Sequence, residues 1–125
     1  MPAKAVDPAE MRAAVQAVLP WLSGEADQPP RPALAAAVRL SLRTLEQLAP
    51  GRSVEVRVPP FAAVQCIEGP RHTRGTPPNV VETDARTWLL LATGALTWTD
   101  ALDSAQVTAS GTRADISALL PVVRF

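Results

Sequence analysis

The chain is poor in the residue types that most often carry chemistry. Its 125 residues include one cysteine, Cys66, and one histidine, His72. A single cysteine forms no internal disulfide or thiolate cluster, and a single histidine excludes most multi-histidine metal sites. We therefore predict no metal, no cofactor and no catalytic residue. We interpret Cys66 as a small buried core residue, because no second histidine or acidic motif supports a nucleophile.

Net charge and long apolar runs are missing too. Twelve basic and 12 acidic residues leave a formal charge of zero, so a nucleic-acid partner is not expected. No run approaches the ~18 consecutive apolar residues of a membrane-spanning helix. The first ten residues lack the apolar stretch of a signal peptide, so we expect a cytoplasmic protein.

What the chain does contain is a series of helix and strand signals, and its length fits one domain over residues 1–125. Residues 7–49 form the helical N-terminal part. Asp7, Pro8 and Glu10 predict a helix start, and apolar residues then follow helical spacing as far as Leu22. After a proline-rich loop, a second amphipathic helix is predicted over about residues 32–49, with Leu48 on its apolar face.

Residues 53–121 predict a sheet with further helices. Residues 53–58 (SVEVRV) alternate apolar and polar side chains, which indicates a half-buried strand. Residues 61–68 predict an antiparallel second strand, central in the sheet because both of its faces are largely apolar; the pattern leaves open which face points inward. Short strands are predicted at 80–83 and 106–110, helices at 85–93 and 98–103, and a closing helix at 112–120.

The order of signals over residues 79–121 resembles the sterol-carrier-protein-2-like family, and more narrowly its small stand-alone bacterial members, the bacterial SCP ortholog type. The resemblance rests on a strand, the Asp84 cap, a helix ended by Gly94, a short helix, a strand ending at Gly111 and a terminal helix. It implies an α+β fold: a mixed, mainly antiparallel sheet of four to five strands covered by helices, here with two N-terminal helices. It also implies an apolar tunnel that holds a lipid.

The apolar residues best placed to line such a cavity lie in the predicted strands and C-terminal helices. They are Val56, Val58, Phe61, Val64, Trp88, Leu91, Trp98, Leu102, Leu119 and Leu120. A lipid site needs apolar walls, since each methylene taken from water contributes ~0.8 kcal/mol. The alternative is that these side chains pack a dry core.

A polar cluster stands in the loop before the third predicted strand. Arg71, His72 and Arg74 combine two guanidiniums with an imidazole, and such groups hold a carboxylate or phosphate head group. The alternative is a solvated loop, or pairing with Glu68 and Glu82.

We interpret the chain as a non-enzymatic lipid-binding or lipid-transport protein. Its partner would be a small apolar or acyl-chain ligand such as a fatty acid, acyl-CoA or other lipid. The alternative is a structural or protein-interaction module with a filled core, for which a homodimer is possible. A third interpretation, a stand-alone enzyme, predicts loss of turnover when Arg71, His72 or Arg74 is replaced.

Overall fold

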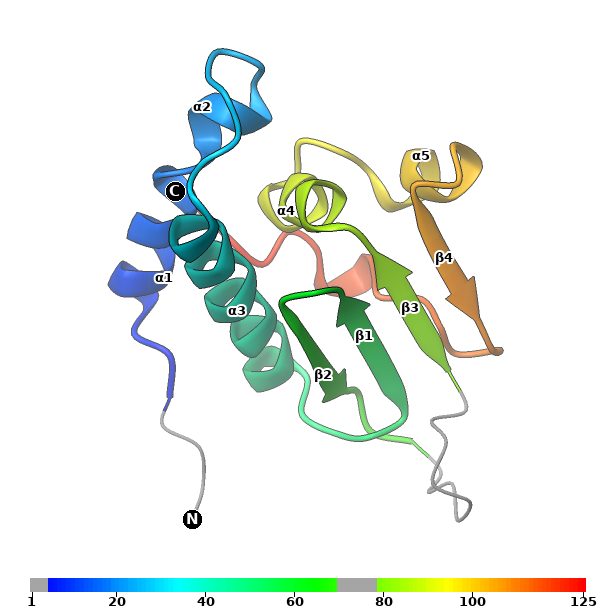
Figure 1. Cartoon of the computed structure of the whole chain (residues 1–125). Helices are drawn as coiled ribbons and strands as arrows, with labels where there is room; N and C mark the ends of the chain where they lie inside the picture. The colour runs from blue at the N-terminus through cyan, green and yellow to red at the C-terminus, as the bar shows by residue number, and fades with distance from the viewer. Residues whose placement is uncertain (1–4, 70–78) are drawn as a thin grey trace.

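The computed structural model of the chain describes residues 5–69 and 79–125 (Figure 1). Three helices come first, followed by three strands, two helices, a fourth strand and a 3-10 turn. In order they are α1 (Pro8–Gln16), α2 (Leu19–Leu22), α3 (Arg31–Leu48), β1 (Val54–Val58), β2 (Ala62–Cys66), β3 (Val80–Thr83), α4 (Ala85–Thr93), α5 (Trp98–Asp103), β4 (Val107–Ser110) and a 3-10 turn, η1 (Ser117–Leu119). The bounds of β3 and α4 are those predicted.

The four strands form one sheet in the order β2-β1-β3-β4. β1 is antiparallel to β2 and parallel to β3, and β3 is antiparallel to β4. This confirms the predicted α+β fold with a mixed, mainly antiparallel sheet. β2 lies at the edge, so its predicted central position is wrong. α3 packs along the apolar face of β2, and β3 lies at the edge of β1 opposite to β2 (Figure 1).

One face of the sheet belongs to the hydrophobic core. Val54, Val56 and Val58 of β1 are fully buried, whereas Glu55 and Arg57 alternate with them on the other face. The β1–β2 register places Val64 opposite Val56 and Cys66 opposite Val54. Opposed residues share a face of the sheet, so Val64 and Cys66 face the core.

The N-terminal helical part differs from its prediction in two respects. The helix expected to reach Leu22 is broken into α1 and α2, because Pro20 has no N–H to continue the ladder of α1. Asp7 caps α1 as predicted, its Oδ1 accepting from the backbone N–H of Ala9 at 2.9 Å. α3 packs against α1, α4 and β2, and Leu48 at its end is 59% exposed and not on the buried face.

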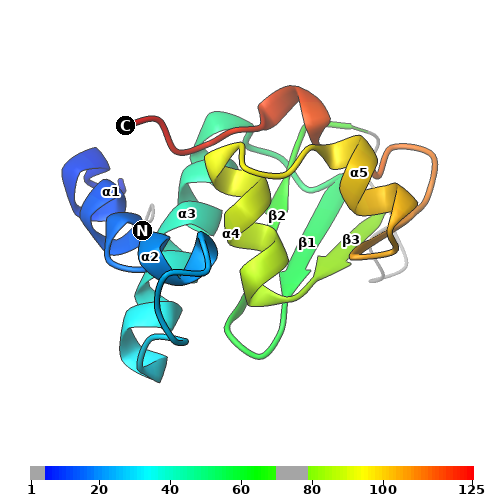
Figure 2. The ribbon, with the colours of Figure 1, turned by 90° about the horizontal axis from the view of Figure 1, so that it is seen from above.

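The closing helix predicted over residues 112–120 is wrong. Only η1 forms there, and the segment beyond it is extended and runs past the end of α4 (Figure 2). Both Val122 and Val123 donate backbone hydrogen bonds to the carbonyl of Ala92 at 3.0 Å. Pro121 disfavours the helical conformation at the preceding Leu120, which is extended, and the two hydrogen bonds to Ala92 hold the chain beyond it.

Candidate functional site

The first candidate site lies where α4, α5 and the C-terminal segment meet. It is a groove of about 330 Å³, which we call the α4–α5 groove. Its lining residues are Leu91, Gly94, Leu96, Thr97, Trp98, Thr99, Ser117, Leu120 and Pro121.

Local capping positions the walls of this groove. Gly94 ends α4 in the left-handed conformation, with φ at 82°, which glycine adopts without strain. Thr97 starts α5, its hydroxyl oxygen accepting from the backbone N–H of Asp100 at 3.1 Å. The hydrogen bonds to the Ala92 carbonyl hold the neighbouring Leu120 and Pro121 against α4.

The lining of the α4–α5 groove is apolar with a hydroxyl rim. Leu91 and Trp98 are buried, and the only polar side chains in the lining are threonines and a serine. No charged side chain is among the nine lining residues. This arrangement suits an apolar chain, and the nine residues provide no oppositely charged partner for a charged head group.

Three of the ten predicted cavity residues, Leu91, Trp98 and Leu120, come together in this groove. The structure places the others elsewhere: Val56, Val58 and Trp88 are fully buried in the core, Val64 and Leu119 are half-buried, Leu102 is 39% exposed on α5, and Phe61 lines a second groove.

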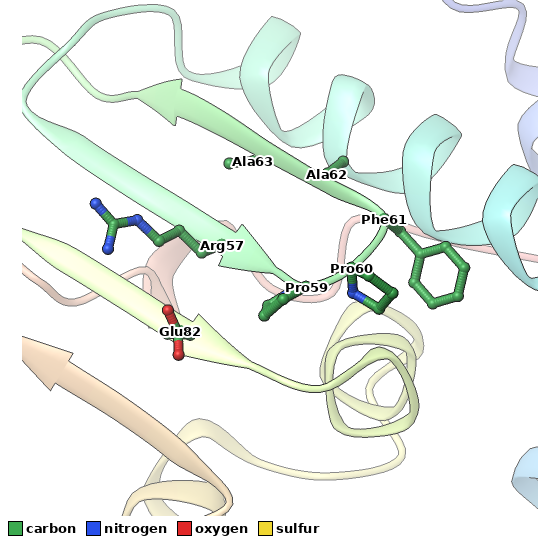
Figure 3. Close-up of a pocket in the computed structure, with 7 residues that line it drawn as sticks. All are labelled: Arg57, Pro59, Pro60, Phe61, Ala62, Ala63 and Glu82. Atoms are coloured by element: carbon green, nitrogen blue, oxygen red, sulfur yellow. The ribbon is translucent and has the colours of Figure 1, made fainter.

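The second groove lies at the turn between β1 and β2 and has a volume of about 310 Å³ (Figure 3). Its lining comprises Arg57, Pro59, Pro60, Phe61, Ala62, Ala63 and Glu82. Arg57 forms an ion pair with Glu55, which raises the pKa of the guanidinium. Phe61 points away from Arg57, and Arg31 stacks over its ring at 5.2 Å from the centroid. The polar groups here do not converge on a common point.

The third groove lies between α2 and α4, and we call it the α2–α4 groove. It has a volume of about 590 Å³ and is lined by Gln16, Leu19, Pro20, Leu22, Ser23, Glu25, Leu90, Thr93 and Ala95. None of these residues was a predicted site residue. Leu19 and Leu22 fitted the apolar face of the first predicted helix, and only the contact of α2 with α4 turns them into a groove wall.

Comparison with protein families adds to this geometry. Residues 30–122 match the family described as bacterial SCP ortholog. The chain belongs to this family. The match extends over about three quarters of the chain and confirms the resemblance to the small bacterial sterol-carrier-like group. The comparison with curated proteins finds no match.

Within this bacterial SCP ortholog, the family match includes α3, the sheet and the whole α4–α5 groove. α1 and α2 precede the matched residues, so one wall of the α2–α4 groove lies outside the family match. The predicted head-group residues Arg71, His72 and Arg74 lie outside the residues that the structure describes.

Three further findings concern features away from the grooves. Cys66 is buried, as predicted, and burial raises the pKa of its thiol to about 11, with a smaller contribution from the charge of Glu46. In residues 5–69 and 79–125, no group of three or more histidine, cysteine or acidic side chains is arranged to hold a metal ion. No helix of the described part is both long and apolar enough to span a bilayer.

Proposed function

We propose that this bacterial SCP ortholog binds the acyl or other apolar chain of a lipid in the α4–α5 groove and carries it without catalysing a reaction. Fatty acids, acyl-CoA and neutral lipids share such a chain. We expect this activity in the cytoplasm.

The observation that carries the proposal is the meeting of Leu91, Trp98 and Leu120 in a groove whose described lining residues carry no charge. Its volume of about 330 Å³ is at the lower end of small-molecule sites. The groove therefore accommodates part of a long chain, and each methylene that leaves water contributes ~0.8 kcal/mol. Family membership supports the same ligand class.

The C-terminal segment offers a route for ligand release. It forms one wall of the groove through Leu120 and Pro121, and the hydrogen bonds from Val122 and Val123 fasten it to a single carbonyl, that of Ala92. Opening this wall breaks these two hydrogen bonds and exposes the buried side chains of Val122 and Val123, but it leaves the strand pairing of the sheet intact.

An NMR titration tests the proposal. The chain has three tryptophans, so three indole N–H signals are expected, and Trp98→Phe identifies the signal of the groove. Decanol or decanoate should shift the Trp98 signal and leave that of Trp88, which is buried and bonded to Ser41. Shifts that spare Trp98 would contradict the proposal.

A matched pair of variants sharpens this test. Leu120→Gln places an amide in the groove wall and should weaken decanol binding about tenfold, since burial of a leucine side chain contributes about 1.5–3 kcal/mol. Leu48→Gln changes a leucine that is 59% exposed and lines none of the three grooves. It should leave the affinity unchanged.

A second candidate function is favoured by three of the ten predicted cavity residues. Val56, Val58 and Trp88 are fully buried within one packed core, as the alternative of an interaction module requires. In that case no lipid shifts the Trp98 signal, and size-exclusion chromatography at rising concentration detects a homodimer.

A further inference from the structure

The α2–α4 groove is the largest of the three grooves described, at about 590 Å³. This volume is well inside the range of about 300–1,000 Å³ for small-molecule sites. Its apolar walls come from Leu19 and Leu22 on one side and Leu90 and Ala95 on the other. α2 lies outside the residues matched by the family, so the family match does not account for this groove.

The walls of this groove are held in place by specific contacts. Arg86 Nη2 on α4 donates a hydrogen bond to the carbonyl of Leu22 at 2.9 Å, and its guanidinium lies 5.9 Å from the ring centroid of Trp21. These contacts hold the end of α2 against α4. The groove is therefore largely preformed, which lowers the cost of ordering on binding.

The turn after α2 fixes the rim. The Ser23 hydroxyl and the Glu25 backbone N–H both donate to the carbonyl of Pro20, at 3.1 and 2.8 Å. These bonds close the turn and place Glu25 at the edge of the groove, where its side chain is exposed.

The polar lining presents acceptors far more than donors. The Ser23 hydroxyl donates its hydrogen bond to the carbonyl of Pro20, and the Thr93 hydroxyl donates to the carbonyl of Leu89 at 2.8 Å. Both oxygens are then left to accept, and the Glu25 carboxylate only accepts. Gln16 is the one lining side chain with N–H groups to offer. Within residues 5–69 and 79–125, no basic residue lines the groove and no basic side chain pairs with Glu25.

We propose that the α2–α4 groove is a second ligand site, selective for an amphiphile with a primary ammonium head. The apolar body lies between α2 and α4, and the ammonium donates to the Glu25 carboxylate and the Ser23 hydroxyl oxygen. An ammonium has three donors and no acceptor, which complements this rim. A carboxylate head meets acceptors and the like charge of Glu25. This site is separate from the proposed function, which concerns the α4–α5 groove.

The test compares three probes of equal chain length, decylammonium, decanol and decanoate, each below its micelle concentration, on the whole chain by ¹⁵N NMR. Decylammonium should shift the backbone signals of Leu22, Leu90 and Ala95. It should bind more tightly than decanoate, by up to about fivefold, the upper end of what an exposed ion pair contributes.

Charge reversal at the rim provides the decisive comparison. Glu25→Lys should reverse the preference, so that decanoate binds more tightly than decylammonium. Asp27→Lys makes the same charge change two residues away, at an exposed residue outside the lining, and should keep the wild-type preference. Thermal unfolding of each variant shows that the fold is retained.

Three outcomes would overturn the proposal: decanoate binding as tightly as decylammonium, an unchanged preference in Glu25→Lys, or a concentration-dependent dimer whose shifts map to Leu22 and Leu90. Failure of the lipid proposal is seen separately, because it concerns the Trp98 signal and the Leu120→Gln variant. Leu120→Gln should not change decylammonium binding at the α2–α4 groove.

Discussion

Trp88 on α4 donates a hydrogen bond from its indole Nε1 to the Ser41 hydroxyl on α3, at 2.8 Å, with both side chains fully buried. The Ser41 hydroxyl in turn donates a hydrogen bond to the carbonyl of Ala37 at 2.6 Å. The largest fully buried side chain is thus paired across two helices that are distant in sequence. The Ser41 hydroxyl, in the middle of an apolar helix face, provides the hydrogen-bond acceptor for this buried indole N–H.

Ser41→Ala should therefore destabilise the fold by about 1–3 kcal/mol, because it leaves a buried N–H without an acceptor. Urea unfolding measures the loss. Thr44→Ala is the control, since the Thr44 hydroxyl donates to Leu40 within the same helix at 2.8 Å, and it should cost much less. Equal losses in the two variants would show that the Trp88 contact contributes nothing particular.

Cys66 provides a prediction about pH. Its thiol pKa is raised from 9.0 to about 11 by burial, so the folded state holds its proton where the unfolded state has lost it. The stability contributed by the thiol is complete below pH 9 and is lost as pH rises through 11, by roughly 2–3 kcal/mol at most. Unfolding measured at pH 8 and pH 10.5 should show this loss, and Cys66→Ala should lack it.

The same burial should protect the thiol from reagents. At pH 8 Ellman's reagent should label Cys66 only on addition of denaturant, because the thiolate is the reactive form. Rapid labelling of the native chain would contradict the buried position.

Alanine substitutions at two glycines distinguish the cost of a strained backbone conformation from the cost of an atomic overlap. Gly51 has φ at 153°, and a Cβ there would overlap the backbone carbonyl of Ile67. Gly94 has φ at 82°, but a Cβ there would lie 3.5 Å from Pro121, an ordinary contact. Gly94→Ala should cost about 1–2 kcal/mol from conformation alone, and Gly51→Ala at least about 3 kcal/mol. Similar losses in urea unfolding would rule out the overlap at Gly51.

The head-group prediction can be tested directly by mutation. If Arg71 and Arg74 hold a carboxylate, the double variant Arg71→Gln/Arg74→Gln should weaken decanoate binding at least about tenfold, the value of a charge-assisted hydrogen bond. Decanol binding should not change. Arg43→Gln, an exposed α3 residue outside the three grooves, is the control. An equal loss for decanol and decanoate would contradict this role.

Local signals predicted the central part of the fold. Asp84 caps α4 through the backbone N–H of Thr87 at 2.8 Å, and Gly94 ends it, so both bounds of the helix were contained in a short stretch of sequence. β1 was equally clear, because Val54, Val56 and Val58 alternate with charged residues and one face of this strand is open.

Predictions that depended on distant contacts were wrong. The sequence of β2 is apolar on both faces, which is typical of a central strand. Its position at the edge follows from the pairing of β1 with β3, and α3 then packs on β2. The segment of residues 112–120 has the cap pattern of a helix, but it forms no α-helix. Ala114 and Ile116 are buried although they do not belong to a helix face, and the Ala92 carbonyl anchors the extended residues that follow the segment. The grooves also depend on distant contacts, since helix packing brought Leu91, Trp98 and Leu120 together and left Val56 and Val58 in the core.

The most direct test of the central claim is native mass spectrometry of the purified chain, with organic extraction of any bound molecule. The lipid-binding account predicts a reproducible adduct of lipid mass that added fatty acid or acyl-CoA displaces, and its loss or reduction in Leu120→Gln. A mass without adduct that stays unchanged after incubation with these lipids would contradict the account and favour the filled-core interaction module.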